Sequence, residues 1–140
     1  MSFNRINDIA ASGMAAQRLR VQLIAANIAN AETTRTADGG PFKKKDAVFQ
    51  VLDMGKNASG QPFTGVQVSE IATSKDPFIT KFDPTHPDAD AEGLVRFPNV
   101  SPVEEMVNLT EASRAFEANV AVVRAVRAMS LSAQDLLRVQ

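Results

Sequence analysis

The feature that most constrains the fold is a heptad pattern at the end of the chain, in residues 101–140. Ser101 is suited to be an N-cap, Pro102 takes the first helical position, and Glu104 follows three residues after the cap, as in a capping box. The heptad core positions that follow are mostly apolar: Leu109, Ala112, Phe116, Asn119, Val123, Val126, Ser130, Ala133 and Leu137. A second apolar row widens this stripe, at Val122, Met129 and Leu136. The segment therefore predicts a long helix that contacts neighbours on more than one side.

A second helix is predicted near the start of the chain. The larger apolar side chains recur there at helical spacing, at Phe3, Ile6, Met14, Val21, Ile24 and Ile28. At about 1.5 Å per residue, this helix would be roughly 40 Å long. Gly13 lies inside it, although glycine costs a helix interior up to about 1 kcal/mol relative to alanine. We therefore expect the backbone of another element to approach the helix closely at Gly13.

The middle of the chain, residues 32–100, has a different composition. It contains all seven glycines except Gly13 and all seven prolines except Pro102, together with short alternating apolar runs. This predicts short strands and loops around a small core. The expected fold class is mainly α with a β-rich insertion, in which the terminal helices pair as a coiled-coil-like bundle. The expected division is into an N-terminal helix (1–31), a middle segment (32–100) and a C-terminal helix (101–140).

Charge and cysteine content exclude several classes of function. The chain has 15 Lys and Arg against 16 Asp and Glu, so no overall field attracts nucleic acid or an anionic membrane. It has no Cys, and hence no disulfide and no thiolate metal site. No stretch approaches the roughly 20 apolar residues of a membrane-spanning helix, and residues 1–11 lack the apolar run of a secretory signal. We expect no nucleic-acid partner, no direct membrane insertion and no cleaved signal peptide.

Little in the sequence favours catalysis or metal binding. There is one His and no Cys, Tyr or Trp, and no nucleophile elbow or phosphate-binding loop is present. His86 lies between two prolines in a turn and is interpreted as structural. Asp88, Asp90 and Gly93 resemble the first half of a calcium loop, but Asn99 stands where a bidentate carboxylate is needed. We interpret this segment as an acidic solvated turn, and we expect no catalytic residue, no cofactor and no metal.

Two polar clusters have plain structural interpretations. The only basic run, Lys43 to Lys45, has Asp46 beside it, which favours a solvated loop or a salt bridge between subunits over a phosphate site. Asn27 and Asn30 follow the first helical pattern and fit a helix end, because Asn tolerates the left-handed C-cap conformation.

Motifs in all three segments resemble those of one protein family. Residues 26–36, followed by residues 39–42, resemble the N-terminal signature of bacterial flagellar rod and hook proteins. Residues 83–100 resemble the signature of the proximal rod proteins, whose acidic turn other axial proteins lack, and residues 104–109 continue it. Residues 112–120 are similar to the C-terminal helix motif that the family shares. The motif positions on which we place most weight are Asn27, Asn30, Thr33, Asp83, Pro84, His86, Pro87, Asp88, Asp90, Gly93, Pro98 and Asn99.

The resemblance implies a non-enzymatic structural subunit of the proximal rod of the flagellar basal body, part of the shaft that transmits torque from motor to hook. It implies that the partners are copies of the chain, other rod proteins and the flagellar type III export apparatus. The implied location is the rod in the periplasmic space, reached without cleavage of a signal peptide. The subunit interface is expected on apolar positions of the terminal helices, at Ile6, Met14, Val21, Ile24, Ile28, Leu109, Phe116, Val123 and Leu137. We also expect these helices to order fully only on joining the rod.

Two alternatives are open at this point. The first is a soluble helical adaptor or secretion chaperone that holds a partner through the C-terminal heptads. The second is a small metal-dependent enzyme built on the acidic turn.

Overall fold

The structure is a computed structural model that describes residues 3–56 and 60–138, with side chains described as far as residue 136. Two helices enclose four strands in sequence order: α1 (Phe3–Ala29), β1 (Lys45–Lys56), β2 (Pro62–Thr73), β3 (Ile79–Phe82), β4 (Leu94–Phe97) and α2 (Pro102–Arg138). The fold is mainly helical with a strand-containing insertion, as the sequence predicts.

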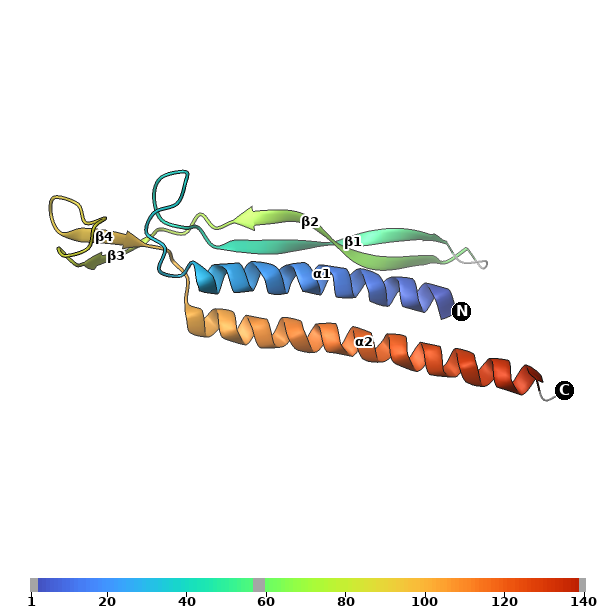
Figure 1. Cartoon of the computed structure of the whole chain (residues 1–140). Helices are drawn as coiled ribbons and strands as arrows, with labels where there is room; N and C mark the ends of the chain where they lie inside the picture. Colours follow the sequence, from blue (N-terminus) through green and yellow to red (C-terminus); the bar gives the residue numbers. More distant parts are fainter. Residues whose placement is uncertain (1–2, 57–59, 139–140) are drawn as a thin grey trace.

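The elements form an elongated stack with α1 in the middle (Figure 1). On one side α1 packs against β1 and β2, and on another side it packs against α2. The two helices run antiparallel, so both ends of the chain lie at the same end of the molecule (Figure 1). Among the elements described, α2 packs against α1 and against no strand. Most of the surface of α2 is therefore uncovered in the single chain.

The start of α2 follows the predicted capping pattern in part. Ser101 accepts the first hydrogen bonds of the helix: the Glu104 N–H donates to Ser101 Oγ at 3.4 Å, and the Glu105 N–H donates to the Ser101 carbonyl at 3.0 Å. Pro102 then begins the helix without needing a donor partner. The return bond of a capping box, from the Glu104 carboxylate, does not form in the described part of the chain. Glu104 instead contributes negative charge to the first helical turn, as Glu105 does.

Two antiparallel ribbons make up the middle segment. In the first, β1 and β2 pair from Lys45↔Thr73 to Lys56↔Pro62, with register shifts after Val48 and Asp53. Such bulges increase the twist of a two-stranded ribbon, and in Figure 1 this ribbon winds along the length of α1. The second ribbon, β3 with β4, projects beyond the ends of the helices that lie opposite the two chain ends (Figure 1).

The predicted close approach at Gly13 is present, although the neighbour is a side chain and not a backbone. A Cβ atom on Gly13 would lie 3.0 Å from Asn119 Nδ2 of α2. Asn119, one of the two polar residues in the heptad positions of α2, therefore packs against the one glycine of α1. On the β2 side, a Cβ atom on Gly65 would lie 2.5 Å from Ser12 Oγ, which accepts a hydrogen bond from the Val66 N–H at 3.1 Å. Helix α1 is thus held closely on two faces at the same level.

The interior is narrow and is built mostly from small side chains. The buried apolar residues are Ala10, Ala16, Ile24, Ala31, Val95, Val100, Ala112 and Val126. Many large apolar side chains stay on the surface, including Val51 at 67% exposure and Leu136 at 75%. Neither helix, in the part described, has the length and hydrophobicity needed to cross a membrane.

Candidate functional site

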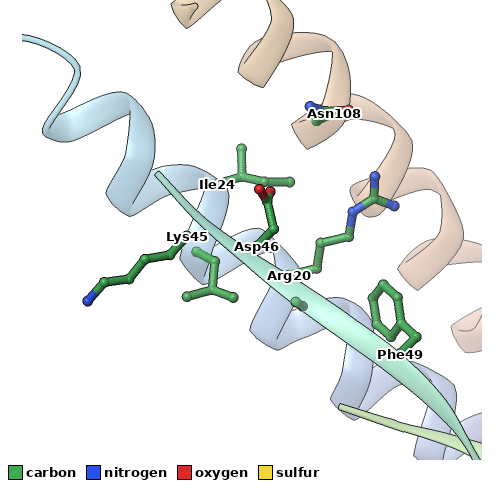
Figure 2. A pocket seen from close by; sticks show the side chains of 8 residues that line it. Arg20, Ile24, Lys45, Asp46, Phe49 and Asn108 are labelled. Carbon is green, nitrogen blue, oxygen red and sulfur yellow. The ribbon is translucent and has the colours of Figure 1, made fainter. Parts of the chain in front are cut away.

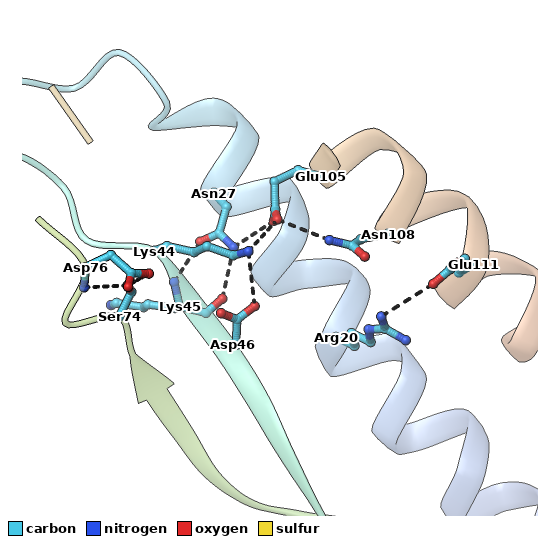
Figure 3. A network of polar contacts seen from close by, with 10 residues as sticks. All are labelled: Arg20, Asn27, Lys44, Lys45, Asp46, Ser74, Asp76, Glu105, Asn108 and Glu111. Atoms are coloured by element: carbon cyan, nitrogen blue, oxygen red, sulfur yellow. Dashed lines mark hydrogen bonds and ion pairs between the residues drawn. The ribbon is translucent and has the colours of Figure 1, made fainter. Parts of the chain in front are cut away.

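A buried polar junction joins the end of α1, the start of β1 and the start of α2. Asn27 and Glu105 are the buried polar residues here, with exposures of 0% and 1%. The Asn27 side-chain amide accepts a hydrogen bond from the Lys45 N–H and donates to the Lys45 carbonyl, both at 2.9 Å. It also donates to Glu105 Oε2 at 2.9 Å (Figure 3). One carboxamide therefore satisfies both backbone groups of the first residue of β1 and attaches α2 to them.

The Glu105 carboxylate is satisfied on both oxygens. Its Oε1 atom lies 3.0 Å from Lys44 Nζ and accepts a hydrogen bond from Asn108 Nδ2 at 3.3 Å. Lys44 also lies 3.9 Å from the Asp46 carboxylate (Figure 3). A buried charge without partners would be strongly destabilising, so the junction holds α2 in place only while all its members are present.

The charges of the junction shift two pKa values in opposite directions. Burial acts to raise the pKa of Glu105, but the hydrogen bonds from Asn27 and Lys44 and the charge of Lys44 outweigh burial, and the pKa lies below its ordinary value. Burial acts to lower the pKa of Lys44, but the hydrogen bond to Glu105 and the charge of Asp46 outweigh it, and this pKa lies above its ordinary value. Both groups are therefore charged across the neutral pH range.

The junction corrects two interpretations made from the sequence. Asn27 and Asn30 do not take the left-handed conformation, since no described residue other than glycine has a positive φ. Asn30 instead donates from Nδ2 to the Ala26 carbonyl at 2.9 Å and accepts a hydrogen bond from Thr33 Oγ1 at 3.1 Å. Lys44 does not lie in a fully solvated loop, because it is partly buried and pairs with Glu105 of the same chain, whereas Lys43 and Lys45 are exposed. The sequence signals for this junction are the signature residue Asn27, the acidic first turn of α2 and an isolated basic run, and none of them shows that these residues meet.

The acidic turn uses its carboxylates for its own hydrogen bonds. Asp83 Oδ1 accepts from the N–H and the hydroxyl of Thr85, at 3.1 and 2.7 Å. Asp90 Oδ1 accepts from the N–H groups of Glu92 and Leu94. These are the bonds of side-chain-stabilised turns and give the two carboxylates a structural role.

Two residues of the N-terminal signature, Thr34 and Arg35, contact the acidic turn through Asp88. The Asp88 carboxylate accepts from Thr34 Oγ1 at 2.7 Å and lies 3.0 Å from Arg35 Nη2. His86 Nδ1 accepts from the Asp88 N–H at 3.1 Å, and the His86 ring meets Phe97 edge to face, with 6.0 Å between centroids. His86 therefore has structural contacts within the turn. Of the other motif positions, Gly93 and Pro98 are buried, and Pro84, Pro87 and Asn99 are exposed. A Cβ atom on Gly93 would lie 3.2 Å from Pro84 Cβ.

The residues expected at a subunit interface lie along the two helices. Ile24 is fully buried against the neighbouring elements. Leu137 lies in α2, but its side chain is outside the described part of the chain. The others are partly buried: Ile6, Met14, Val21, Ile28, Leu109, Phe116 and Val123. Their role between subunits remains a prediction.

Two hollows flank the helix pair. A cleft of about 320 Å³ lies between α1, β1 and α2 and is lined by residues that include Arg20, Asp46 and Phe49 (Figure 2). The second hollow, which we call the helix groove, is lined by α1 and α2 alone. It consists of two adjoining parts of about 300 and 280 Å³ that share Arg18 and Phe116. Its apolar walls are Ala11, Met14, Ala15, Val21 and Phe116.

Known proteins share both the helices and the segment between them. The family described as "Flagella basal body rod protein" matches residues 8–35, and the family "Flagellar basal body rod FlgEFG protein C-terminal" matches residues 91–136. A flagellar basal-body rod protein FlgC of Borreliella burgdorferi is 41% identical over 97% of both chains. The protein of the same name in Salmonella typhimurium is 41% identical over 97% of this chain and 98% of its own. That of Bacillus subtilis is 35% identical over 96% of this chain and 97% of its own.

The paired terminal helices and the two matching family regions define an axial protein of the bacterial flagellum, of the rod class. Since the similarity to FlgC extends over nearly the whole chain, the chain belongs to the FlgC family of flagellar basal-body rod proteins.

Proposed function

We propose that the chain is a non-enzymatic structural subunit of the rod of the flagellar basal body. The observation that carries this proposal is the similarity to proteins named FlgC, which includes the helices, the acidic turn and the ribbons alike. The buried junction supports the proposal, because its polar residues form structural hydrogen bonds that fix helices in place.

In this proposal the subunits polymerise through α1 and α2, with the heptad rows continuing as coiled-coil-like contacts between subunits. The exposed apolar residues of α2 support this idea: Val122 is 43% exposed and Met129 is 50% exposed in the single chain. A helix with apolar rows on two faces requires a second neighbour to bury the second row. Residues 1–31 and 101–140 would form the rod core, and residues 32–100 would face outward or toward adjacent subunits.

The finer placement is also part of the proposal. The subunit would lie in the proximal rod within the periplasmic space, contact copies of itself and other rod proteins, and leave the cell through the flagellar type III apparatus without losing a signal peptide. In the assembled rod it would form part of the shaft that transmits torque to the hook.

Deletion and complementation in the source bacterium test this function. Cells that lack the gene should form no rod in electron micrographs of basal bodies and should not swim. The wild-type chain supplied in trans should restore both the rod and swimming. Deleted cells that build complete rods and swim would contradict the function.

A further inference from the structure

The end of α2 extends past the helix that covers the rest of it. Three pairs of facing residues fix the alignment of the antiparallel helices: Asn27 with Glu105, Arg20 with Glu111, and Gly13 with Asn119. Continued at the same rise per residue, this alignment brings the start of α1 level with about residue 129 of α2. Figure 1 shows the red end of α2 reaching beyond the blue start of α1. The last described turns of α2, residues 130–138, form an overhang of about 13 Å that α1 does not cover.

One face of the overhang is apolar and exposed. Ala133 and Leu136, with Met129 directly before the overhang, follow the spacing that places residues on a single helix face. Met129 is 50% exposed and Leu136 is 75% exposed. Moving an aliphatic side chain from water to full burial is favourable, so a partner surface would bind this face favourably.

The helix groove has the size and chemistry to accept this face. Along α1 it extends from Ala11 to Gln22, about 16 Å, which is close to the length of the overhang. Alanines line part of its walls, so a neighbouring helix can approach closely. Phe116 and Met14 provide apolar contacts in its interior. The β1–β2 ribbon does not cover the groove, because the groove is lined by residues of α1 and α2 alone.

The charges beside the two surfaces are complementary. Arg18 belongs to both parts of the groove, and Asp135 stands next to Leu136 on the overhang. Neither side chain forms an ion pair with any residue in the described part of the chain, where the four ion pairs involve other groups. Arg18 of one copy could form an ion pair with Asp135 of another copy, which would give each side chain a partner of opposite charge.

We propose that the overhang of one copy of this chain docks in the helix groove of the next copy. The two surfaces lie on different parts of the molecule, so the contact is head-to-tail and each added copy presents a new overhang. Such a contact generates an open helical assembly in place of a closed dimer. This inference rests on the proposed function and specifies one of its interfaces.

Cysteine cross-linking tests the contact, and the absence of native cysteines makes the chain suitable for it. One variant carries Gln22→Cys beside the groove, and the other carries Ala133→Cys on the overhang. A disulfide requires Cα atoms within about 7 Å, so a mixture of the two variants under oxidation should give a cross-linked heterodimer. A chain with both substitutions should give a ladder of oligomers. Cross-linking no greater than that of Ala133→Cys mixed with Glu70→Cys, a control on β2, would overturn the proposal.

Matched substitutions on the two sides of the overhang show which face is used. In the doubly substituted chain, Leu136→Asp should reduce the ladder about tenfold, because it places a charge in the apolar contact. Leu131→Asp, on the opposite side of the same turns, should leave it unchanged. Equal loss in both variants, or no loss in either, would overturn the assignment.

A charge exchange gives an independent test. Arg18→Glu should weaken the ladder, and Asp135→Arg in the same chain should restore it, because the exchanged charges again attract. Absence of restoration would contradict the ion pair.

If the wild-type chain restores rods and swimming while no cross-link forms, the docking contact is wrong and the rod function stands. If it restores neither rods nor swimming, the rod function itself fails.

Discussion

At the residue scale, one buried carboxylate joins the three segments of the chain. Glu105 receives hydrogen bonds from a signature asparagine of α1 and from a side chain of its own helix, and it pairs with the lysine that precedes β1. The family signature around Asn27 therefore has a physical role within the single subunit: it fixes the start of β1 and the start of α2 against the end of α1.

Removing the charge of Glu105 is predicted to destabilise the free subunit. Glu105→Gln keeps the shape but leaves Lys44 without its buried anionic partner, and we expect a loss of about 2 kcal/mol in the free energy of unfolding. Glu104→Gln changes an exposed neighbour in the same helical turn and should cost no more than about 0.5 kcal/mol. Urea denaturation at pH 7 compares the two variants. Equal losses would mean that the junction does not stabilise the fold.

The same junction predicts how stability depends on pH. The pKa of Glu105 is lowered in the folded state, so its contribution is complete above the unfolded value of about 4.3 and is lost as pH falls through the folded value. The pKa of Lys44 is raised, so its contribution is complete below about 10.4 and is lost as pH rises through the folded value. Between these limits the junction does not make the free energy of unfolding depend on pH.

Unfolding measurements between pH 3 and 7 test the acid limb. Asp83 also has a lowered pKa, because of its hydrogen bonds with Thr85, and this contributes its own acid dependence. Asp83 is present in both the wild type and Glu105→Gln, so its acid dependence cancels in the difference between their free energies of unfolding. This difference should shrink as the pH falls below about 4. A difference that stays constant down to pH 3 would contradict the assigned role of Glu105.

At the element scale, the helices were predictable from sequence and their contacts were not. Apolar periodicity and the Ser101–Pro102 start identify α1 and α2, because these signals are local. The glycine inside α1 also indicated a close neighbour. The identity of that neighbour, Asn119, depends on the antiparallel alignment of helices far apart in sequence, which periodicity does not encode. The contact of Gly65 with Ser12 gave no local signal at all.

The contact between Gly13 and Asn119 predicts a coupled pair of substitutions. Gly13→Ala gains about 1 kcal/mol of helix propensity, but its methyl group crowds the Asn119 side chain. The same change in an Asn119→Ala background meets no such crowding and should stabilise the chain. A double-mutant cycle by thermal unfolding should therefore show a coupling of about 1 kcal/mol. Additive effects would show that the helices do not meet at this level.

At the scale of the whole molecule, the single chain covers its helices unequally. Helix α1 has the β1–β2 ribbon on one side and α2 on another, whereas the end of α2 has no neighbour among the described elements. The sequence analysis predicts that the terminal helices order fully only in the rod. Because the last turns of α2 lack a neighbour in the single chain, we expect their order to depend most on a partner.

Hydrogen exchange can measure this difference along α2. In the free subunit, backbone amides near residues 108–123 should be protected by the packing against α1, and those of residues 130–136 should exchange faster. Assembly should slow exchange in the second group. Equal protection of both groups in the free subunit would contradict a partner-dependent end.

If the rod is built through the helices and the groove between them, a side chain that lines this groove is needed for assembly. The most direct measurement is the number of rods in electron micrographs of basal bodies from deleted cells that express Phe116→Ala or the matched control Phe82→Ala. Phe116 lines the groove, and its loss should cost on the order of 3 to 5 kcal/mol if the assembly buries it fully; Phe82 lies on β3 and is 72% exposed. We predict that Phe116→Ala gives helical free protein by circular dichroism but few or no rods, while Phe82→Ala gives rods. Normal rods and swimming with Phe116→Ala would contradict assembly through this helix pair.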